Sequence, residues 1–148
     1  MRRLLFTTIA LTAAIGVAAP SIAAGSRATV KTRHGELGTF LVDGKGRTLY
    51  LFEQDKTKKS TCYGACATAW PPLLTSGKAK RAGKAKGSLL GTTKRRNGKL
   101  QVTYNGHPLY YFIRDKKAGD TKGEGVDGFG AEWYVVAPSG KKIEDEDD

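Results

Sequence analysis

Two cysteines, two histidines and a repeated aspartate are the residues of this chain whose types and spacing could do chemistry. Cys62 and Cys66 are its only cysteines. In an oxidising compartment an even pair of cysteines favours a disulfide. A perfect helix holds i and i+4 Cβ atoms about 5–6 Å apart, whereas a disulfide needs roughly 3.5–4.5 Å. A bonded pair therefore requires a turn or a distorted helix end at residues 62–66.

The same cysteines could instead serve redox or metal chemistry. Thioredoxin-like sites use Cys-x-x-Cys on a βα unit, and the spacing here is one residue longer. Covalent haem attachment needs His after the second Cys, where Ala67 stands. Two cysteines with His34 and His107 would suffice for tetrahedral zinc, but each histidine stands beside Gly or Pro at a predicted hairpin. We predict a disulfide, no metal site and no cofactor.

Asp55 and Asp115 end the same pattern, Tyr-x-Phe-x-x-Asp, in two copies 60 residues apart. With Glu53, Asp120 or Glu132 they could form an acid/base pair, since glycosidases use two carboxylates at a defined separation. A structural role explains more, because an aspartate just past a strand accepts backbone N–H bonds in an Asx-type turn. We predict that role and no enzyme. The structural set is Tyr50, Phe52, Asp55, Trp70, Tyr110, Phe112, Asp115 and Trp133.

The elements that position these residues are predicted to be strands. Turns are expected at His34-Gly35 and Asp43-Gly-Lys-Gly46 in the first copy, and at Asn97-Gly98 and Asn105-Gly106 in the second. Asn-Gly and Asp-Gly supply the positive φ that tight hairpins need. Each half is therefore predicted to be a three-stranded antiparallel meander with the motif strand third.

The motif strands, residues 48–52 and 108–113, are apolar on both faces. Tyr50 and Phe52 share one face, and the leucines before and between them share the other. Such a strand is central, with packing on each side. Neither meander can bury a face alone. We predict an all-β, mainly antiparallel fold, packed as a small sandwich or barrel, with one short helix or turn around the Cys pair.

Beyond the motif the two copies differ in sequence. Ser60 or Thr61 is expected to cap a short helix that ends before Pro71. The second copy instead passes through a Gly-rich loop, Gly119 to Gly130, into a strand at residues 133–136. Function is most readily sought where the copies differ.

The N-terminus has the pattern of a secretory signal. Arg2 and Arg3 precede an apolar run, Leu4 to Ala19, whose length of about 16 residues is short of the roughly 20 that span a bilayer. Pro20 and small residues follow. We predict a cleaved signal peptide at residues 1–24, no later transmembrane segment, and a periplasmic or secreted location in a bacterium.

The rest of the chain is expected to form one domain, residues 25–143. Its repeats span about 27–74 and 88–140. Residues 75–87 between them are mainly Gly, Ala and Lys with little to bury, as in a mobile linker or long loop. The acidic tail, residues 144–148, is expected to be disordered.

Removing Arg2 and Arg3 with the signal leaves 23 cations against 14 acids, a net charge of +9. The basic stretch in mid-chain is either a solvated loop or a site for an anionic envelope polymer or lipid head groups. It contains no aromatic residue for base stacking, so no specific nucleic acid is expected. Its candidate residues are Lys78, Lys80, Arg81, Lys84, Lys86, Lys94, Arg95 and Arg96.

The motif strands, the block Cys62-Tyr-Gly-Ala-Cys66-x-x-x-Trp70-Pro-Pro72-Leu and the run Gly128-Phe-Gly130-x-x-Trp133-Tyr-Val-Val resemble a family of secreted repeats. Its members are described as predicted lipoproteins with a Tyr-x-aromatic-x-x-Asp motif. The resemblance covers residues 36–140 and implies no defined activity, and this chain lacks a lipobox cysteine. We expect a non-enzymatic envelope or secreted binding or structural module. The alternative is a small redox or metal-handling protein that uses the Cys pair.

Overall fold

The computed structural model describes residues 13–16 and 25–144. The predicted signal peptide and acidic tail lie outside these ranges, apart from residues 13–16 and Glu144. In the described ranges no helix is long and apolar enough to cross a membrane.

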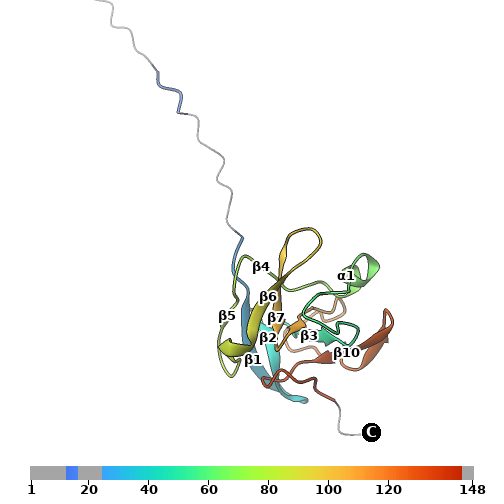
Figure 1. Ribbon diagram of the computed structural model, residues 1–148. Helices are drawn as coiled ribbons and strands as arrows, with labels where there is room; N and C mark the ends of the chain where they lie inside the picture. Colours follow the sequence, from blue (N-terminus) through green and yellow to red (C-terminus); the bar gives the residue numbers. More distant parts are fainter. Residues whose placement is uncertain (1–12, 17–24, 145–148) are drawn as a thin grey trace, which may run out of the picture.

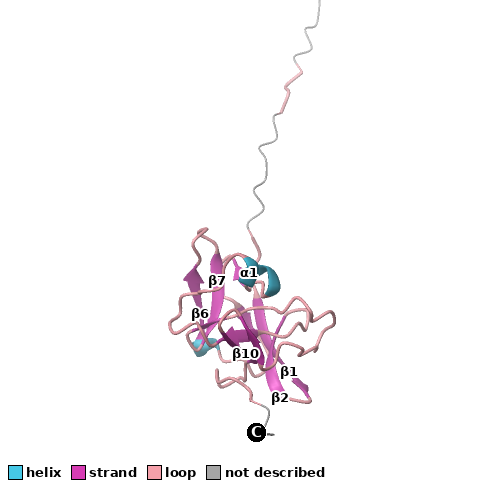
Figure 2. Ribbon diagram, turned by 90° about the vertical axis from the view of Figure 1, so that its right-hand side faces the viewer, coloured by secondary structure: helices cyan, strands magenta, loops and turns pink. Residues whose placement is uncertain are grey.

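The domain is built from short strands and one short α-helix (Figures 1 and 2). In chain order the elements are β1 (Thr29–Gly35), β2 (Gly38–Asp43), β3 (Tyr50–Phe52), α1 (Ala65–Ala69), β4 (Leu74–Thr75), β5 (Lys80–Arg81), the 3-10 turn η1 (Gly87–Leu89), β6 (Leu90–Lys94), β7 (Leu100–Tyr104), β8 (His107–Pro108), β9 (Val126–Gly128) and β10 (Ala131–Val135). As predicted, α1 ends before Pro71 and residues 133–135 form a strand.

Three small sheets make up the fold, in the orders β2-β1-β5, β3-β10-β9 and β4-β7-β6. In the third sheet β8 also pairs with β7, at Thr103 and Tyr104. All strand pairs are antiparallel except β1 with β5. The prediction of a mainly antiparallel β fold with one short helix is confirmed. The described sheets do not close into a barrel.

The predicted meanders form only as far as the residue before each motif tyrosine. The β1–β2 hairpin and the β6–β7–β8 meander are present. Leu49 N–H donates to Leu41 O at 3.1 Å, and Leu109 N–H donates to Val102 O at 3.0 Å, so each chain returns beside its own hairpin. Up to this point the two repeats fold alike.

At the tyrosines the chain leaves its own repeat. Tyr50 N–H donates to Tyr110 O at 2.9 Å, and Tyr110 N–H donates to Tyr50 O at 3.0 Å. β3 then continues beside β10, with Phe52 opposite Trp133. The expectation that the motif strand is the third strand of its own meander was therefore wrong from the tyrosine onward. The physical reason is that residues apolar on both faces need partners that one hairpin cannot supply.

Two hydrophobic clusters lie on either side of the motif strands. The leucines of the motif strands, including Leu51, belong to an aliphatic cluster with Val30 and Val102. Tyr50, Phe52 and their counterparts belong to an aromatic cluster. The predicted division of the two strand faces is confirmed.

The segment between the repeats is packed against β1. Ala79 and Ala85 are buried, and Ala82 N–H donates to Val30 O at 3.1 Å. The expectation that residues 75–87 have little to bury was wrong at these alanines, which are small enough to lie under a strand edge. Their lysines and arginine remain exposed.

Candidate functional site

The repeated motif forms a reciprocal pair of hydrogen bonds between the repeats. Tyr50 O–H donates to Asp115 Oδ2 at 2.5 Å, and Tyr110 O–H donates to Asp55 Oδ2 at 2.6 Å. Both carboxylates are buried, at 6% exposure for Asp55 and 4% for Asp115. Each tyrosine therefore bonds to the aspartate of the other copy, 65 or 55 residues away in sequence.

The second oxygen of each carboxylate fixes the loop that follows its own strand. Asp55 Oδ1 accepts from the Thr61 N–H at 2.8 Å and its hydroxyl at 2.6 Å. Asp115 Oδ1 accepts from the Lys122 N–H at 2.9 Å. The predicted backbone N–H partners exist, but they lie six and seven residues on, not in a local Asx turn. We call these two tyrosines and two aspartates, with their hydrogen bonds, the Tyr–Asp lock.

The lock keeps its phenols neutral. Burial raises the pKa of Tyr50 and of Tyr110 well above the ordinary value of 10.0, and the adjacent carboxylate raises each further. Burial also raises the pKa of Asp115, while the hydrogen bond from Tyr50 and the Lys122 N–H oppose that rise. The lock therefore pairs two neutral phenol donors with buried carboxylate acceptors, and burial disfavours the charged form of Asp115.

Four aromatic rings stack across the boundary between the repeats, in the order Phe52, Trp133, Trp70 and Phe112. The centroid distances are 4.0, 4.0 and 4.1 Å, with interplanar angles of 8°, 2° and 21°. Each phenylalanine stacks on the tryptophan of the other copy. The motif tyrosines meet the tryptophans edge-on at 5.4 and 5.1 Å. Such contacts add about 0.5–1.5 kcal/mol each beyond area burial.

Gly123 should not tolerate a side chain. Its N–H donates to the Tyr50 hydroxyl at 3.1 Å, and a Cβ built on it would lie 2.8 Å from the rings of Trp70 and Tyr50. Because those rings are rigid and packed against each other, we expect Gly123→Ala to lower the free energy of unfolding by about 1–3 kcal/mol. Urea unfolding measures the change. Gly77→Ala, where a Cβ meets nothing within 4 Å, should change stability by less than about 0.5 kcal/mol. Equal effects would contradict the packing described.

The cysteines form the predicted disulfide, with Cα atoms 5.2 Å apart. Cys62 precedes α1 and Cys66 lies in its first turn, with the bend at Gly64, whose φ is +59°. The predicted turn at a helix end is confirmed, but the cap is Gly64 rather than Ser60 or Thr61. Those two side chains bond to the Tyr–Asp lock instead, Ser60 Oγ at 2.7 Å from the Tyr110 hydroxyl.

Arg95 belongs to the interior and not to an anion-binding surface. It is 6% exposed, and its guanidinium donates to Cys62 O at 2.8 Å, to Gln101 Oε1 at 2.8 Å and to Ser60 Oγ at 3.0 Å. Its prediction as a polyanion ligand was wrong, because its planar guanidinium donates to acceptors of the Cys-bearing loop and of Gln101 inside the fold.

The other cations of the basic stretch are exposed but divided between two places. Residues 78–86 lie along β5 and the loops beside it. Lys94 and Arg96 lie at the far end of β6, roughly 13 Å along a five-residue strand. There Arg96 and Arg95 hold the Tyr63 ring between them, with guanidinium carbons 4.2 and 4.3 Å from its centroid. The stretch is therefore not a single patch.

The two segments that differ between the copies meet at an open cleft, which we call the Trp70 cleft. It has a volume of about 480 Å³. The cleft is lined by Ala69, Trp70, Phe112, Ile113, Arg114, Lys122, Val126, Asp127, Gly128 and Phe129. One end of the aromatic stack thus reaches its floor. On its rim Ile113 is 45% exposed and Phe129 is 50% exposed.

Phe129 occupies a turn position that suits a smaller residue. It lies between β9 and β10 with φ +59°, followed by Gly130 at φ +95°. Hairpin turns with two positive φ values favour Asn or Gly at the first position, and a left-handed backbone costs most other residues about 1–2 kcal/mol. The half-exposed ring gains little packing in return. Backbone outliers of this kind concentrate at functional sites, so the left-handed backbone of Phe129 marks the Trp70 cleft as a candidate functional site.

The charges of the Trp70 cleft are free to meet a ligand. Arg114 and Lys122 are exposed. In the described part of the chain every ion pair involves Lys142, so neither of these cations is paired there. Asp127 is the one acid among the lining residues. An apolar floor and rim with two unpaired cations suit an anion that carries an apolar part.

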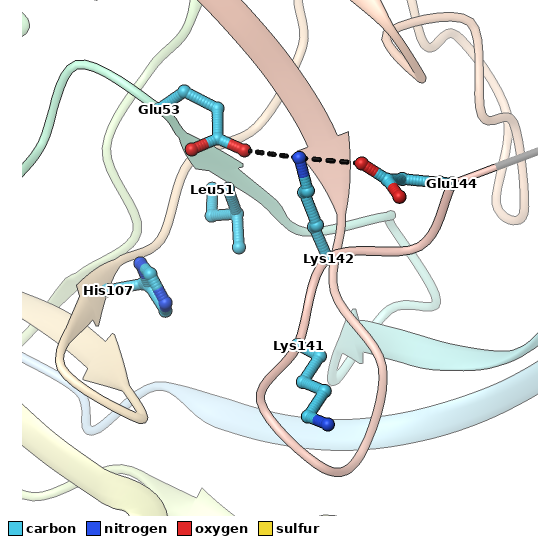
Figure 3. Close-up of a pocket in the computed structure, with 6 residues that line it drawn as sticks. All are labelled: Leu51, Glu53, His107, Lys141, Lys142 and Glu144. Carbon is cyan, nitrogen blue, oxygen red and sulfur yellow. Dashed lines mark ion pairs between the residues drawn. The ribbon is translucent and has the colours of Figure 1, made fainter.

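A second cavity, of about 400 Å³, lies between β3, β8 and the C-terminal segment (Figure 3). It is lined by Leu51, Glu53, His107, Lys141, Lys142 and Glu144. Lys142 Nζ lies 2.9 Å from Glu53 Oε1 and 2.6 Å from Glu144 Oε1, so its charge is already matched. Among residues 13–16 and 25–144, no three His, Cys, Asp or Glu side chains are placed to hold a metal ion.

Sequence patterns missed the residues that build the Trp70 cleft. Ile113 and Arg114 lie in one turn, Lys122 lies in a second turn and Phe129 lies in the turn between β9 and β10. The fold brings these three turns together. A local signal existed only at Phe129-Gly130, where a turn carries a large apolar side chain in the place of Asn or Gly.

Comparison with known proteins gives a family but no activity. Comparisons with curated proteins and with solved structures found no match. A family model described as a secreted repeat of unknown function matches residues 31–74 and 91–137, once in each repeat and over more than half of the chain. Its description as secreted supports an extracytoplasmic location. The chain therefore belongs to this family of secreted repeats of unknown function.

Proposed function

We propose that the protein is a non-enzymatic binding module of the extracytoplasmic space, and that the Trp70 cleft binds amphiphilic anions. The observation that carries this proposal is that the repeated residues and the unrepeated residues occupy different places in the fold. The motif tyrosines and aspartates bond to one another inside the fold. The unrepeated parts form an open cleft with an exposed phenylalanine in a left-handed turn.

The alternative, a redox role for Cys62 and Cys66, has less support. Thiol–disulfide exchange requires an attacking thiolate to reach a sulfur atom. Cys62 is fully buried and Cys66 is 6% exposed. The carbonyl of Cys62 also holds the Arg95 guanidinium at 2.8 Å, so the disulfide stabilises a packed loop.

The probe 8-anilinonaphthalene-1-sulfonate tests the proposal, because it combines aromatic rings with one anionic group. We expect saturable binding to the folded protein, with energy transfer from the Trp70–Trp133 pair, which are the only tryptophans. Phe129→Gly should weaken binding by roughly tenfold or more, because it removes the half-exposed ring of the rim. The same change should alter stability by less than about 1 kcal/mol, since glycine adopts this backbone freely.

Leu74→Ala is the matched control, because Leu74 is 40% exposed and lines a different cavity. It should leave binding of the probe unchanged. An absence of saturable binding by the natively folded protein, or equal binding by the Phe129→Gly variant, would contradict the proposal.

A further inference from the structure

Large apolar side chains are exposed at few points of this molecule. In the described ranges they are Ile15, Leu74, Ile113 and Phe129. Ile15 precedes the domain, and Leu74 stands alone beside another cavity. Ile113 and Phe129 share the rim of the Trp70 cleft. Apolar exposure is therefore concentrated on this one face.

Two cations, Arg114 and Lys122, line the same cleft, and Lys116 and Lys117 follow Arg114 closely in sequence. Arg114, Lys116, Lys117 and Lys122 are all exposed, and none forms an ion pair within the described ranges. Of the acids in this region, Asp127 is exposed and lines the same cleft, so the four exposed cations outnumber it. Asp115 is buried in the Tyr–Asp lock, as described above. Asp120 Oδ2 accepts the backbone N–H groups of Lys116 and Lys117, at 3.1 and 3.0 Å.

The backbone under this face is held firmly. Ile113 N–H donates to Ala69 O at 3.0 Å, which ties the rim to α1. Asp115 fixes the loop at the Lys122 N–H. The β9–β10 hairpin that carries Phe129 lies on the side of the molecule away from β5 (Figure 1). The face is thus rigid and separate from the lysines along β5.

From these observations we infer that the rim of the Trp70 cleft docks on an anionic lipid surface. Phe129 and Ile113 enter the boundary between head groups and acyl chains, while Arg114, Lys116, Lys117 and Lys122 meet the head groups. This inference rests on the proposed function, since such a lipid is one class of amphiphilic anion.

A lipid surface uses both properties of this face. Peripheral binding scales with inserted apolar area plus attraction between cations and anionic head groups. A soluble polyanion would engage the cations alone and leave Ile113 and Phe129 in water. The extracytoplasmic location of the family gives the face access to a membrane surface.

Vesicle flotation tests the inference with the chain from Gly25 onward, which carries every described strand and helix of the domain. One set of vesicles contains phosphatidylcholine alone, and the other contains phosphatidylglycerol in addition. We expect binding to the second set only, weakening as salt rises. The double variant Arg114→Gln/Lys122→Gln should weaken binding roughly 25-fold, at about fivefold for each cation. Phe129→Gly should weaken it roughly tenfold.

The matched control is Lys80→Gln/Lys84→Gln, which removes the same charge beside β5 and should weaken binding less than about threefold. Equal losses in the two double variants would overturn the inference. The inference would also be overturned if the Phe129→Gly variant bound the vesicles as well as the unchanged protein does and dextran sulfate competed for that binding. The partner would then be a soluble polyanion. If the protein binds the anilinonaphthalene probe but no vesicle, the docking inference is wrong and the proposed function stands. If the protein bound neither the probe nor the vesicles, both the docking inference and the proposed function would be overturned.

Discussion

Raising the pH above 10 should unfold this protein cooperatively. Tyr50 and Tyr110 are buried against carboxylates, so their pKa values lie well above 10.0 in the folded state. In the unfolded chain they ionise near pH 10, and the unfolded state then binds fewer protons than the folded state. Each such tyrosine lowers the free energy of unfolding by about 1.4 kcal/mol per pH unit above 10, or about 2.7 kcal/mol for both.

Tyr111 acts in the same direction, because burial and its 2.7 Å hydrogen bond to Asp43 raise its pKa as well. A domain of ordinary stability should therefore unfold between about pH 12 and 13. Absorbance at 295 nm, read with near-ultraviolet circular dichroism, follows the change. Tyr50→Phe should reduce the pH slope of the unfolding free energy by about 1.4 kcal/mol per unit. Complete phenol ionisation with tertiary structure intact would contradict the burial described.

Replacing Asp55 with alanine should lower the free energy of unfolding by about 3–5 kcal/mol. Its carboxylate accepts three hydrogen bonds, from the Tyr110 hydroxyl and from the N–H and hydroxyl of Thr61. Removing it leaves buried donors without their acceptor, and a buried donor without a partner is costly. Chemical denaturation measures the loss.

Asp127→Ala provides the comparison, because Asp127 is an exposed aspartate of the Trp70 cleft. It should change stability by less than about 0.5 kcal/mol. Similar effects at the two aspartates would show that the Tyr–Asp lock contributes no special stability.

The sequence contained enough local information to predict the first motif strand and the two apolar faces of both motif segments, although in the second copy β8 ends at Pro108. Alternation along residues 48–52 placed Tyr50 and Phe52 opposite the leucines, and the structure agrees. The disulfide followed from the cysteine count. These features depend on neighbours within a few residues, which is the range over which periodicity carries information.

Partners across the repeats could not be predicted in the same way. The motif suggested that Asp55 serves its own strand end, but one of its two carboxylate oxygens bonds to Tyr110, 55 residues away. Both copies carry the same residues, so bonding within a copy and bonding between copies look alike in sequence. Arg95 was misassigned for a related reason, because two of its three acceptors, Ser60 and Cys62, belong to the distant Cys-bearing loop.

The Trp70 cleft depends on the same tertiary contacts. Its floor is one end of an aromatic stack that alternates between the copies, and its rim comes from the turn at Phe129 and the turn at Ile113. The lock fixes both loops that approach this site. In this account the repeat supplies a rigid frame and the differences between the copies supply the binding surface.

The central claim is that the motif joins the two repeats reciprocally, and a double-mutant cycle tests it most directly. Unfolding free energies are measured for Tyr50→Phe, Asp115→Ala, Asp55→Ala and the two double variants that contain Tyr50→Phe. The account predicts a coupling of about 1–3 kcal/mol between Tyr50 and Asp115, which share a 2.5 Å hydrogen bond. It predicts additivity within about 0.5 kcal/mol between Tyr50 and Asp55 of the same copy. Strong coupling within the copy and none between copies would contradict it.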